Sequence, residues 1–377
     1  MIAAIAIAAV LVLAAGATLA YLVASGRRVV RPGGPHVLDI TARPGAVSLP
    51  ASDATRAEGR YGLWYETPAG EAHALLGRVV DEEGGMVTRQ VEAGGPALDV
   101  ARRGRFTGHV FPDPGAASPA PWTQVEIAAP SGPCPAWVSA PPGAAGEAWA
   151  IHIHGFGTTR VTALRTLPAA SSAGLISLIP SFRGDGEGPS TPGGVSMLGQ
   201  SEWADLEAAV EYAAGRGARR IILFGWSMGA SAAFHLVERS AHRGLFAGLV
   251  LVAPVVDWRA LIIAGARRAG LPAAAGRLTA WGLQRRLVDR MIGLPGRIDF
   301  AAARRAVESA ARRLPILILH AERDPLVPFA ASAELAARHP ETVRLVPFDG
   351  VEHAWEYNQH PEAFDAAIAE WVAALEG

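Results

Sequence analysis

From about residue 148 to the C-terminus, the chain alternates short apolar segments with longer amphipathic segments. The short segments have the length of strands, and the longer ones repeat apolar residues every three or four positions, which is typical of helices. Because strands that are apolar throughout must be covered on both faces, this alternation predicts an α/β fold with a mostly parallel sheet between layers of helices. The predicted strands are 148–152, 175–180, 220–224, 249–253, 316–320 and 343–347, and the predicted helices are 161–173, 202–216, 228–239, 327–339 and 361–375.

Two parts of the chain depart from this alternation. Residues 257–313 form an Arg- and Ala-rich helical stretch between two predicted strands, which we interpret as an insertion. Residues 27–147 contain short apolar runs separated by Gly and Pro, a pattern that favours a β-rich module. They hold no cluster of charged or nucleophilic residues that indicates a second active site. The predicted bounds are therefore 27–147 for this module and 148–377 for the α/β domain.

Residues 2–25 carry no charged side chain. These twenty-four residues would form a helix ~36 Å long, which is enough to cross a hydrocarbon core of ~30 Å. A cleaved signal peptide is the alternative, but no basic residue precedes the apolar run, and the run is longer than the ~7–15 residues usual in signal peptides. We therefore expect residues 1–26 to be an uncleaved membrane anchor.

Three arginines, Arg27, Arg28 and Arg31, follow the apolar segment directly. Basic residues beside a membrane span favour the cytoplasmic side. We expect residues 27–377 to face the cytoplasm and the N-terminus to face outward. A secreted or outward-facing protein is the alternative, because long domains can cross a membrane despite flanking charge.

The composition excludes several classes of protein. All 34 basic residues are arginine, and without lysine the chain supports neither Schiff-base or pyridoxal-phosphate chemistry nor a Walker-A phosphate loop. Cys134 is the one cysteine, so the chain can form neither an internal disulfide nor a thiolate zinc site. A net charge of −1 does not suit a nucleic-acid partner. We expect no cofactor and no metal, and the sequence leaves the oligomeric state open.

A nucleophile motif lies between a predicted strand and a predicted helix. Gly225-Trp226-Ser227-Met228-Gly229 has the form G-x-S-x-G, with IILF before it and a helical sequence after it. In this setting a serine sits on a tight strand-to-helix turn, where flanking glycines allow close backbone approach and the helix N-terminus favours developing negative charge. Ser227 is therefore the predicted nucleophile.

A serine nucleophile needs a base, which in turn needs an acid to orient it. Asp324 follows the predicted strand 316–320 in HAERDPLVP, and His353 follows the next strand in FDGVEHAWEYN. Since the carboxyl ends of parallel strands meet at one edge of a sheet, Ser227, Asp324 and His353 are the predicted catalytic triad. Asp257, which follows another strand, is the main alternative to Asp324 as the acid.

The sequence HGFG follows the first strand of the α/β domain. In such a flexible turn the amide of Phe156 can point at an oxyanion together with the amide of Met228, and these two amides are the predicted oxyanion hole. His152 and His154 are two residues apart on a strand and could share a zinc ion, but the sequence offers no third ligand at a suitable spacing.

The loop SFRGDGEGPS follows the second strand. We interpret its charged residues, Arg183, Asp185 and Glu187, as solvated, with substrate contact as the alternative. Arg183 and Trp226, which adjoins the nucleophile, are the candidates for substrate binding.

The chain from about residue 148 resembles the alpha/beta-hydrolase family of serine hydrolases at HGFG, GWSMG, HAERDPLVP and GVEHAW. The esterase and peptidase-like branches are the most similar. The resemblance implies the alpha/beta-hydrolase fold, and it maps the family's nucleophile, acid and base onto Ser227, Asp324 and His353. It maps the family's oxyanion amides onto Phe156 and Met228.

The same resemblance implies that residues 257–313 form a short helical lid. The apolar side chains of this segment, among them Leu261, Leu271 and Trp281, are expected to cover an apolar acyl pocket, with its arginines facing water or lipid head groups. Ordinary packing of an amphipathic insertion is the alternative. Residues 27–147 match no family that we can name.

We therefore expect a membrane-anchored serine hydrolase that cleaves a small or lipid-like carboxylic ester. A peptidase or amidase using the same triad is one alternative, and a membrane-bound interaction protein with a vestigial hydrolase domain is another. The intact set of nucleophile, acid and base favours the enzyme, because an interaction protein needs none of them. The sequence leaves the physiological substrate and its acyl chain length open.

Overall fold

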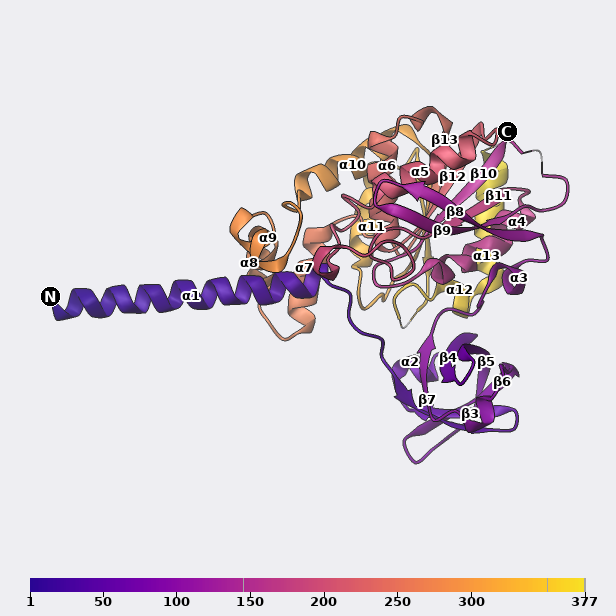
Figure 1. The fold of residues 1–377 in the computed structure, drawn as a ribbon, viewed down its shortest axis with the longest axis horizontal. Coiled ribbons are helices and arrows are strands. Elements are labelled where there is room, and N and C mark those ends of the chain that lie inside the picture. The colour runs from indigo at the N-terminus through magenta and orange to yellow at the C-terminus, as the bar shows by residue number, and fades with distance from the viewer. Residues whose placement is uncertain (145, 351, 376–377) are drawn as a thin grey trace.

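The computed structural model describes residues 1–144, 146–350 and 352–375, and Figure 1 shows its three parts. A long N-terminal helix, α1 (Ile2–Val30), projects from the molecule, a small β module follows it, and an α/β domain forms the rest of the chain. Val351, within the GVEHAW sequence, and the last two residues of the predicted domain lie outside the described residues.

An eight-stranded sheet forms the centre of the α/β domain, in the order β15-β14-β13-β12-β10-β11-β9-β8. Strands β10 to β15 run parallel, and β8 and β9 pair antiparallel at one edge. The mostly parallel α/β sheet predicted from the sequence is therefore confirmed. The strands are β8 (Trp122–Ala129), β9 (Gly132–Ser139), β10 (Ala148–Ile153), β11 (Ile176–Pro180), β12 (Arg220–Trp226), β13 (Phe246–Val252), β14 (Ile316–Ala321) and β15 (Val343–Phe348).

Helices cover both faces of this sheet, because successive strand residues point to opposite faces. In β12, Leu223 packs in the apolar cluster that includes residues of α5, α6, α10 and α11. Its neighbour Phe224 packs in the cluster on the other face, with residues of α4 and α13. The covering helices are α4 (Leu167–Ser172), α5 (Trp203–Ala214), α6 (Met228–Arg239), α10 (Phe300–Arg313), α11 (Phe329–Arg338) and α13 (Pro361–Ala374).

The β module is a separate seven-stranded antiparallel sheet in the order β1-β7-β4-β5-β6-β3-β2. Leu49, Leu63 and Leu76 are fully buried in its own small core. Its strands are β1 (Leu38–Asp39), β2 (Thr41–Arg43), β3 (Ala46–Pro50), β4 (Tyr61–Thr67), β5 (Gly70–Glu83), β6 (Met86–Ala93) and β7 (Arg103–Thr107).

The predicted boundary between the module and the α/β domain, after residue 147, is wrong. β8 and β9 form a hairpin that extends the large sheet, since Trp137 of β9 pairs with Ile179 of β11. Most residues of β8 are exposed, and exposed positions can be polar. The sequence of the hairpin therefore resembles that of the module, with short half-polar runs separated by Gly and Pro. Only this long-range pairing assigns the hairpin to the α/β domain, and the module ends at β7.

The predicted insertion, residues 257–313, is shorter in the structure. Helices α7 (Trp258–Arg268), α8 (Ala273–Gly282) and α9 (Arg286–Ile292) lie beside the end of α1 (Figure 1), and we call these three helices the lid. Helix α10 instead packs against α6 and covers the sheet. The reason is topological: a chain that passes from β13 to its parallel neighbour β14 needs one covering crossover helix.

The last turns of α1 pack against the lid. The Tyr21 hydroxyl donates a hydrogen bond to the carbonyl of Ala275 in α8 at 2.9 Å, and Leu22 and Gly26 are buried. The first part of α1 is exposed, and the helix is long and apolar enough to cross a membrane. The apolar helix expected at residues 1–26 is thus present, and it continues to Val30.

Candidate active site

Ser227 lies on the sharp turn between β12 and α6. Its backbone angles are φ 51° and ψ −112°, a region that non-glycine residues rarely occupy, and such strain costs about 1–3 kcal/mol. Neighbouring backbone holds the turn: the amide of Ser227 donates to the carbonyl of Val252 at 2.9 Å, and the amide of Val255 donates to the carbonyl of Ser227 at 3.1 Å. The side-chain oxygen is thereby presented at the carboxyl end of the sheet.

The glycines of the G-x-S-x-G sequence are required by close backbone approach. A Cβ atom at Gly229 would lie 2.3 Å from the carbonyl oxygen of Ile153, and one at Gly225 would lie 2.8 Å from the Cα of Ala230. Any side chain at either position would push β12, α6 and β10 apart and displace the serine.

His353 and Asp324 lie next to Ser227 in a hydrogen-bonded series. Nε2 of His353 is 2.8 Å from the Ser227 hydroxyl oxygen, and Nδ1 of His353 is 2.6 Å from Oδ2 of Asp324. A carboxylate can only accept, so Nδ1 carries the proton, which leaves Nε2 free to accept the hydroxyl proton of Ser227. The structure therefore brings together the three residues predicted as the triad.

Asp324 is held ionised by its donors. Its side chain is fully buried, and Oδ1 accepts the amides of Leu326 at 2.7 Å and Val327 at 2.8 Å. Burial alone would raise the pKa of Asp324, but hydrogen bonds from His320 and His353 outweigh burial and hold that pKa well below its usual range. The carboxylate of Asp324 is thus charged and fixed in orientation at neutral pH.

His320 is a residue of the site that the sequence analysis missed. It is fully buried near the end of β14, with Nε2 3.2 Å from Oδ2 of Asp324 and Nδ1 2.9 Å from the hydroxyl of Ser332. His320 is thus a second donor to the carboxylate that orients His353. The sequence feature that could have pointed to His320 is its position as the one polar residue in the otherwise apolar strand ILILHA.

Asp257, the alternative acid, has a different role in the structure. It is the N-cap of α7 and accepts the amides of Arg259 at 2.8 Å and Ala260 at 3.0 Å. His353 hydrogen-bonds to Asp324 and not to Asp257.

The two predicted oxyanion residues lie beside Ser227. Phe156 and Met228 line the same cavity as Ser227, and a Cβ atom at Gly155 would be 3.3 Å from the Cβ of Ser227. Among the hydrogen bonds of the described residues, none is donated by the amide of Phe156 or Met228. Neither amide is therefore seen to be taken up by an acceptor within the described residues, and the role of the two amides as an oxyanion hole stays a prediction.

Asp185 was expected to be a solvated loop charge, and the structure contradicts this. Its carboxylate is fully buried 3.0 Å from Nε2 of His154, and it also accepts backbone amides of its own loop, including that of Gly188 at 2.7 Å. Burial raises the pKa of Asp185, but these hydrogen bonds, that from His154 first, outweigh it and lower the pKa to about 2. The pair ties the HGFG loop to the loop after β11.

His152 and His154 do not face a common ligand. The ring nitrogens of His152 are 2.8 Å from the Thr166 hydroxyl and 3.0 Å from the Ser177 hydroxyl, and burial lowers its pKa to about 3. His154 is bonded to Asp185 and to the carbonyl of Gly155. Each imidazole is thus held by its own set of protein groups.

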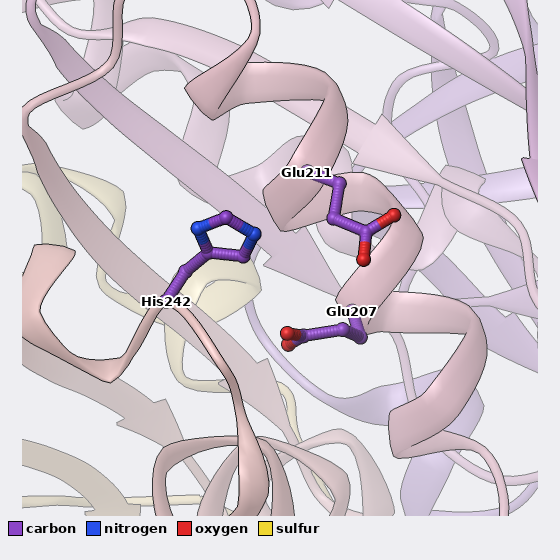
Figure 2. A group of neighbouring side chains, drawn as sticks. All are labelled: Glu207, Glu211 and His242. Carbon is purple, nitrogen blue, oxygen red and sulfur yellow. The ribbon is translucent and has the colours of Figure 1, made fainter.

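One group of potential metal ligands lies away from these residues (Figure 2). Glu207 and Glu211, on successive turns of α5, face His242, and their ligand atoms lie within 4.8 Å of one another. Glu207 already accepts the amide of Ala241 at 2.9 Å, and Glu211 is exposed. These features describe a hydrogen-bonded surface cluster, and we assign it no metal.

A cavity of about 740 Å³ opens above Ser227 and His353. Its walls are mostly apolar and come from distant parts of the chain: α1, the HGFG loop, the lid and the loop that carries His353. The lid contributes one face of α7, with Leu261, Ile262 and Gly265. Ser227 thus faces an apolar chamber large enough for a small lipid-like molecule.

The two candidates for substrate binding differ in position. Arg183 is not among the residues that line this cavity; its guanidinium donates to both carboxylate oxygens of Asp205 at 2.6 and 2.7 Å. Trp226 contributes to the cavity wall, but its ring is fully buried between Arg165 and Phe364. The loop sequence around Arg183 could not indicate this ion pair, because its partner Asp205 lies on a separate helix, α5.

The β module contacts the loop that carries His353. The ring of Trp355 packs against Tyr61, with ring centroids 4.5 Å apart, and against Phe106. The side-chain amide of Asn358 donates to the carbonyls of Arg60 at 2.7 Å and Gly108 at 2.9 Å. The module therefore supports the histidine loop from outside the α/β domain.

We expect the substitution Trp355→Ala to lower kcat for ester hydrolysis by about 10- to 100-fold, because misplacing a reacting group by about 1 Å has effects of this size. Trp355→Phe keeps the ring contact with the module and should retain most of the activity. The matched control is Trp122→Ala on β8, a residue that is 39% exposed and is not part of the cavity lining. Equal kcat values for Trp355→Ala and Trp122→Ala would contradict a positioning role.

Comparisons with known proteins agree with this fold. Residues 36–107 match the model of a "Domain of unknown function (DUF8805)", which covers the β module. Comparison with curated proteins found no match. Among solved structures, the esterase Pf2001 of Pyrococcus furiosus superposes with a TM-score of 0.52 at 18% identity, over 70% of this chain and 96% of that one.

A second similar structure is EstE1, a thermostable carboxylesterase cloned from a metagenomic library, with a TM-score of 0.50 and 21% identity over 70% of this chain and 93% of that one. At these identities the likeness establishes the fold. Residues 150–367, more than half of the chain, match the model of the alpha/beta hydrolase family. The chain therefore belongs to the alpha/beta hydrolase family.

Proposed function

We propose that the protein is a serine hydrolase that cleaves a carboxylic ester with an apolar acyl chain, through an acyl-enzyme on Ser227. The observation that carries the proposal is the series Ser227–His353–Asp324, which meets a mostly apolar cavity at the serine. Each group has the protonation and orientation that nucleophilic catalysis needs.

In the first half-reaction the Ser227 oxygen attacks the ester carbonyl while Nε2 of His353 takes the hydroxyl proton. Asp324 stabilises the imidazolium that forms, and the amides of Phe156 and Met228 stabilise the oxyanion. The tetrahedral intermediate then expels the alcohol, which receives the proton from His353. In the second half-reaction water attacks the acyl-enzyme by the same proton transfers and releases the carboxylic acid.

The direct test is labelling with a fluorophosphonate, which reacts with an activated serine. We expect labelling of Ser227 and hydrolysis of p-nitrophenyl esters. Labelling with hydrolysis of aminoacyl amides in preference to esters would make the protein a peptidase or amidase. No labelling of the folded protein would overturn the proposal and favour a vestigial domain.

The apolar cavity predicts a dependence on acyl chain length. Each methylene buried contributes about 0.8 kcal/mol, so kcat/KM should rise about fourfold per methylene from acetate until the cavity is filled. Gly265→Leu adds a side chain on the cavity wall, where a Cβ would meet only the far end of Arg268 at 3.6 Å. We expect this variant to keep acetate turnover and to lose the gain for long chains, and an unchanged profile would exclude the lid from acyl binding.

We propose further that α1 is an uncleaved anchor, with residues 27–377 on the cytoplasmic side. The three arginines after the apolar run and the packing of Tyr21 against the lid support this, because cleavage near Gly26 would remove part of the cavity wall. In a protease-protection assay on intact cells or spheroplasts, the catalytic domain should be protected. Digestion from outside, or a mature N-terminus near Gly26, would contradict this topology.

A further inference from the structure

We propose that the lid helices α8 and α9 rest on the surface of the bilayer that α1 spans, and that the cavity opens at this surface to an ester dissolved in the membrane. The proposal rests on the proposed function and anchor. It adds an interaction surface, with the lipid bilayer as partner, and it names the substrate class.

The continuity of α1 places the lid next to the predicted membrane span. From Leu19 onward α1 contributes side chains to the protein core, and a Cβ atom at Gly282 of α8 would lie 2.7 Å from Cδ2 of Leu22. The exposed apolar part of α1, residues 2–18, continues into this packed part as one helix without a linker. The elements that hold the end of α1 therefore lie next to the segment that would span the bilayer.

The lid presents apolar side chains at this level. Large apolar residues are exposed along residues 271–291, and the most exposed is Leu287 at 59%. Outside α1, the other exposed large apolar residues that the structure describes are scattered over the module, β8 and the loop after β14. Exposed apolar side chains that gather on one segment, and are not scattered singly, indicate a contact site, and we call these side chains the apolar patch. The patch is Leu271, Leu278, Trp281, Leu287 and Met291.

The charge of the lid complements anionic head groups. Four arginines of residues 273–292, the segment that holds α8 and α9, are exposed, and Asp289, the acidic residue of this segment, is buried with its pKa raised to about 6 by burial. The guanidinium of Arg285 lies 4.3 Å from the ring centre of Trp281, so a cation and an aromatic ring meet as they do at a membrane interface. The arginines are Arg277, Arg285, Arg286 and Arg290.

The cavity mouth lies between α1 and the lid. The exposed residues of the cavity lining mark this mouth, and they come from the end of α1, the end of α7 and the loops beside them. With α1 in the membrane, a molecule that enters here comes from the bilayer boundary. The residues are Ala24, Arg28, Arg268, Ala269, Leu271 and Leu326.

The test relies on site-specific labelling of cysteine, which is simple here because only one native cysteine, Cys134, has to be replaced. In a Cys134→Ala background, single cysteines at Leu287, Val12 and Val100 carry an environment-sensitive fluorophore, and the full-length protein is reconstituted in phosphatidylcholine–phosphatidylglycerol vesicles. Val12 reports the span, and Val100, 61% exposed on the β module, is matched in exposure to Leu287. Nitroxide on lipid and iodide in water are the two quenchers.

We expect nitroxide to quench the label at Leu287 at least threefold more than the label at Val100, and iodide to show the reverse order. Equal quenching at Leu287 and Val100, with Val12 quenched by nitroxide, would overturn the docking surface and leave the span intact. Absence of nitroxide quenching at Val12 would overturn both. Fluorophosphonate labelling of the same vesicles reports the hydrolase function separately.

The substrate class is tested with the double variant Leu287→Glu, Met291→Glu, whose altered side chains are exposed and outside the cavity lining. Activity on a long-chain p-nitrophenyl ester dissolved in the vesicles should fall at least tenfold, while turnover of soluble p-nitrophenyl acetate stays unchanged. Val100→Glu is the control. An equal effect of the double variant on both substrates would overturn entry of substrate from the membrane.

Discussion

Replacement of Ser227 by alanine should reduce kcat for ester hydrolysis by about 10⁶-fold, the size of loss measured when a serine nucleophile is removed from a comparable triad. The backbone of the turn should survive. Its geometry depends on the hydrogen bonds to Val252 and Val255 and on close packing at Gly225 and Gly229, none of which involves the hydroxyl.

The measurement is kcat for a short p-nitrophenyl ester, with the melting temperature and fluorophosphonate labelling of the same sample. Ser231→Ala is the matched control, since Ser231 is a buried serine on α6 whose hydroxyl accepts the indole N–H of Trp258 at 2.9 Å. It should lose about 1 kcal/mol of stability and keep its labelling. A Ser227→Ala variant that is still labelled would remove Ser227 as the nucleophile.

The parts of the fold that the sequence predicted are those encoded by local pattern. Helix α6 occupies the predicted residues 228–239, and the parallel strands lie close to their predicted positions, because fully buried strands and the helices between them need continuous or periodic apolar residues. The hairpin β8–β9 was assigned to the wrong domain, since its place depends on pairing with β11 and leaves no local mark.

The burial of polar groups in the site also depends on long-range contacts, which the local sequence does not reveal. The sequence could order Ser227, Asp324 and His353 along the chain, because each follows a strand whose end lies at one edge of the sheet. It could not tell a solvated charge from a buried one. Asp185 and Arg183 are held by His154 and Asp205, which belong to other segments, and nothing in the loop sequence names these partners.

The sequence also could not predict which segments of the chain line the cavity. The sequence of the apolar N-terminal segment predicts an anchor alone, yet Tyr21 and Ser25 line the cavity and form hydrogen bonds with α8. Contacts between residues about 250 positions apart, such as Tyr21 with Ala275, follow from the tertiary fold. A helix that is long and apolar enough to cross a membrane thus also forms part of the cavity wall.

Substitution of Asp324 by asparagine should lower kcat by about 10⁴-fold, as in the serine-protease template. The reason lies in the donors around this carboxylate. Oδ1 accepts the amides of Leu326 and Val327, so the oxygen of an asparagine must occupy that position. Its NH₂ group then faces His353 and donates to Nδ1, which moves the imidazole proton to Nε2.

A histidine protonated at Nε2 cannot accept the hydroxyl proton of Ser227, so the loss should appear in kcat while KM for a short ester changes little. Asp257→Asn is the control, because asparagine is as good an N-cap as aspartate and α7 should keep its start. If Asp257→Asn proves the damaging change and Asp324→Asn the mild one, the acid has been misassigned. In the proposed mechanism Asp324 acts by keeping the proton of His353 on Nδ1. Comparison of these two variants therefore tests whether Asp324 orients His353 toward Ser227, and not only whether the three residues are present.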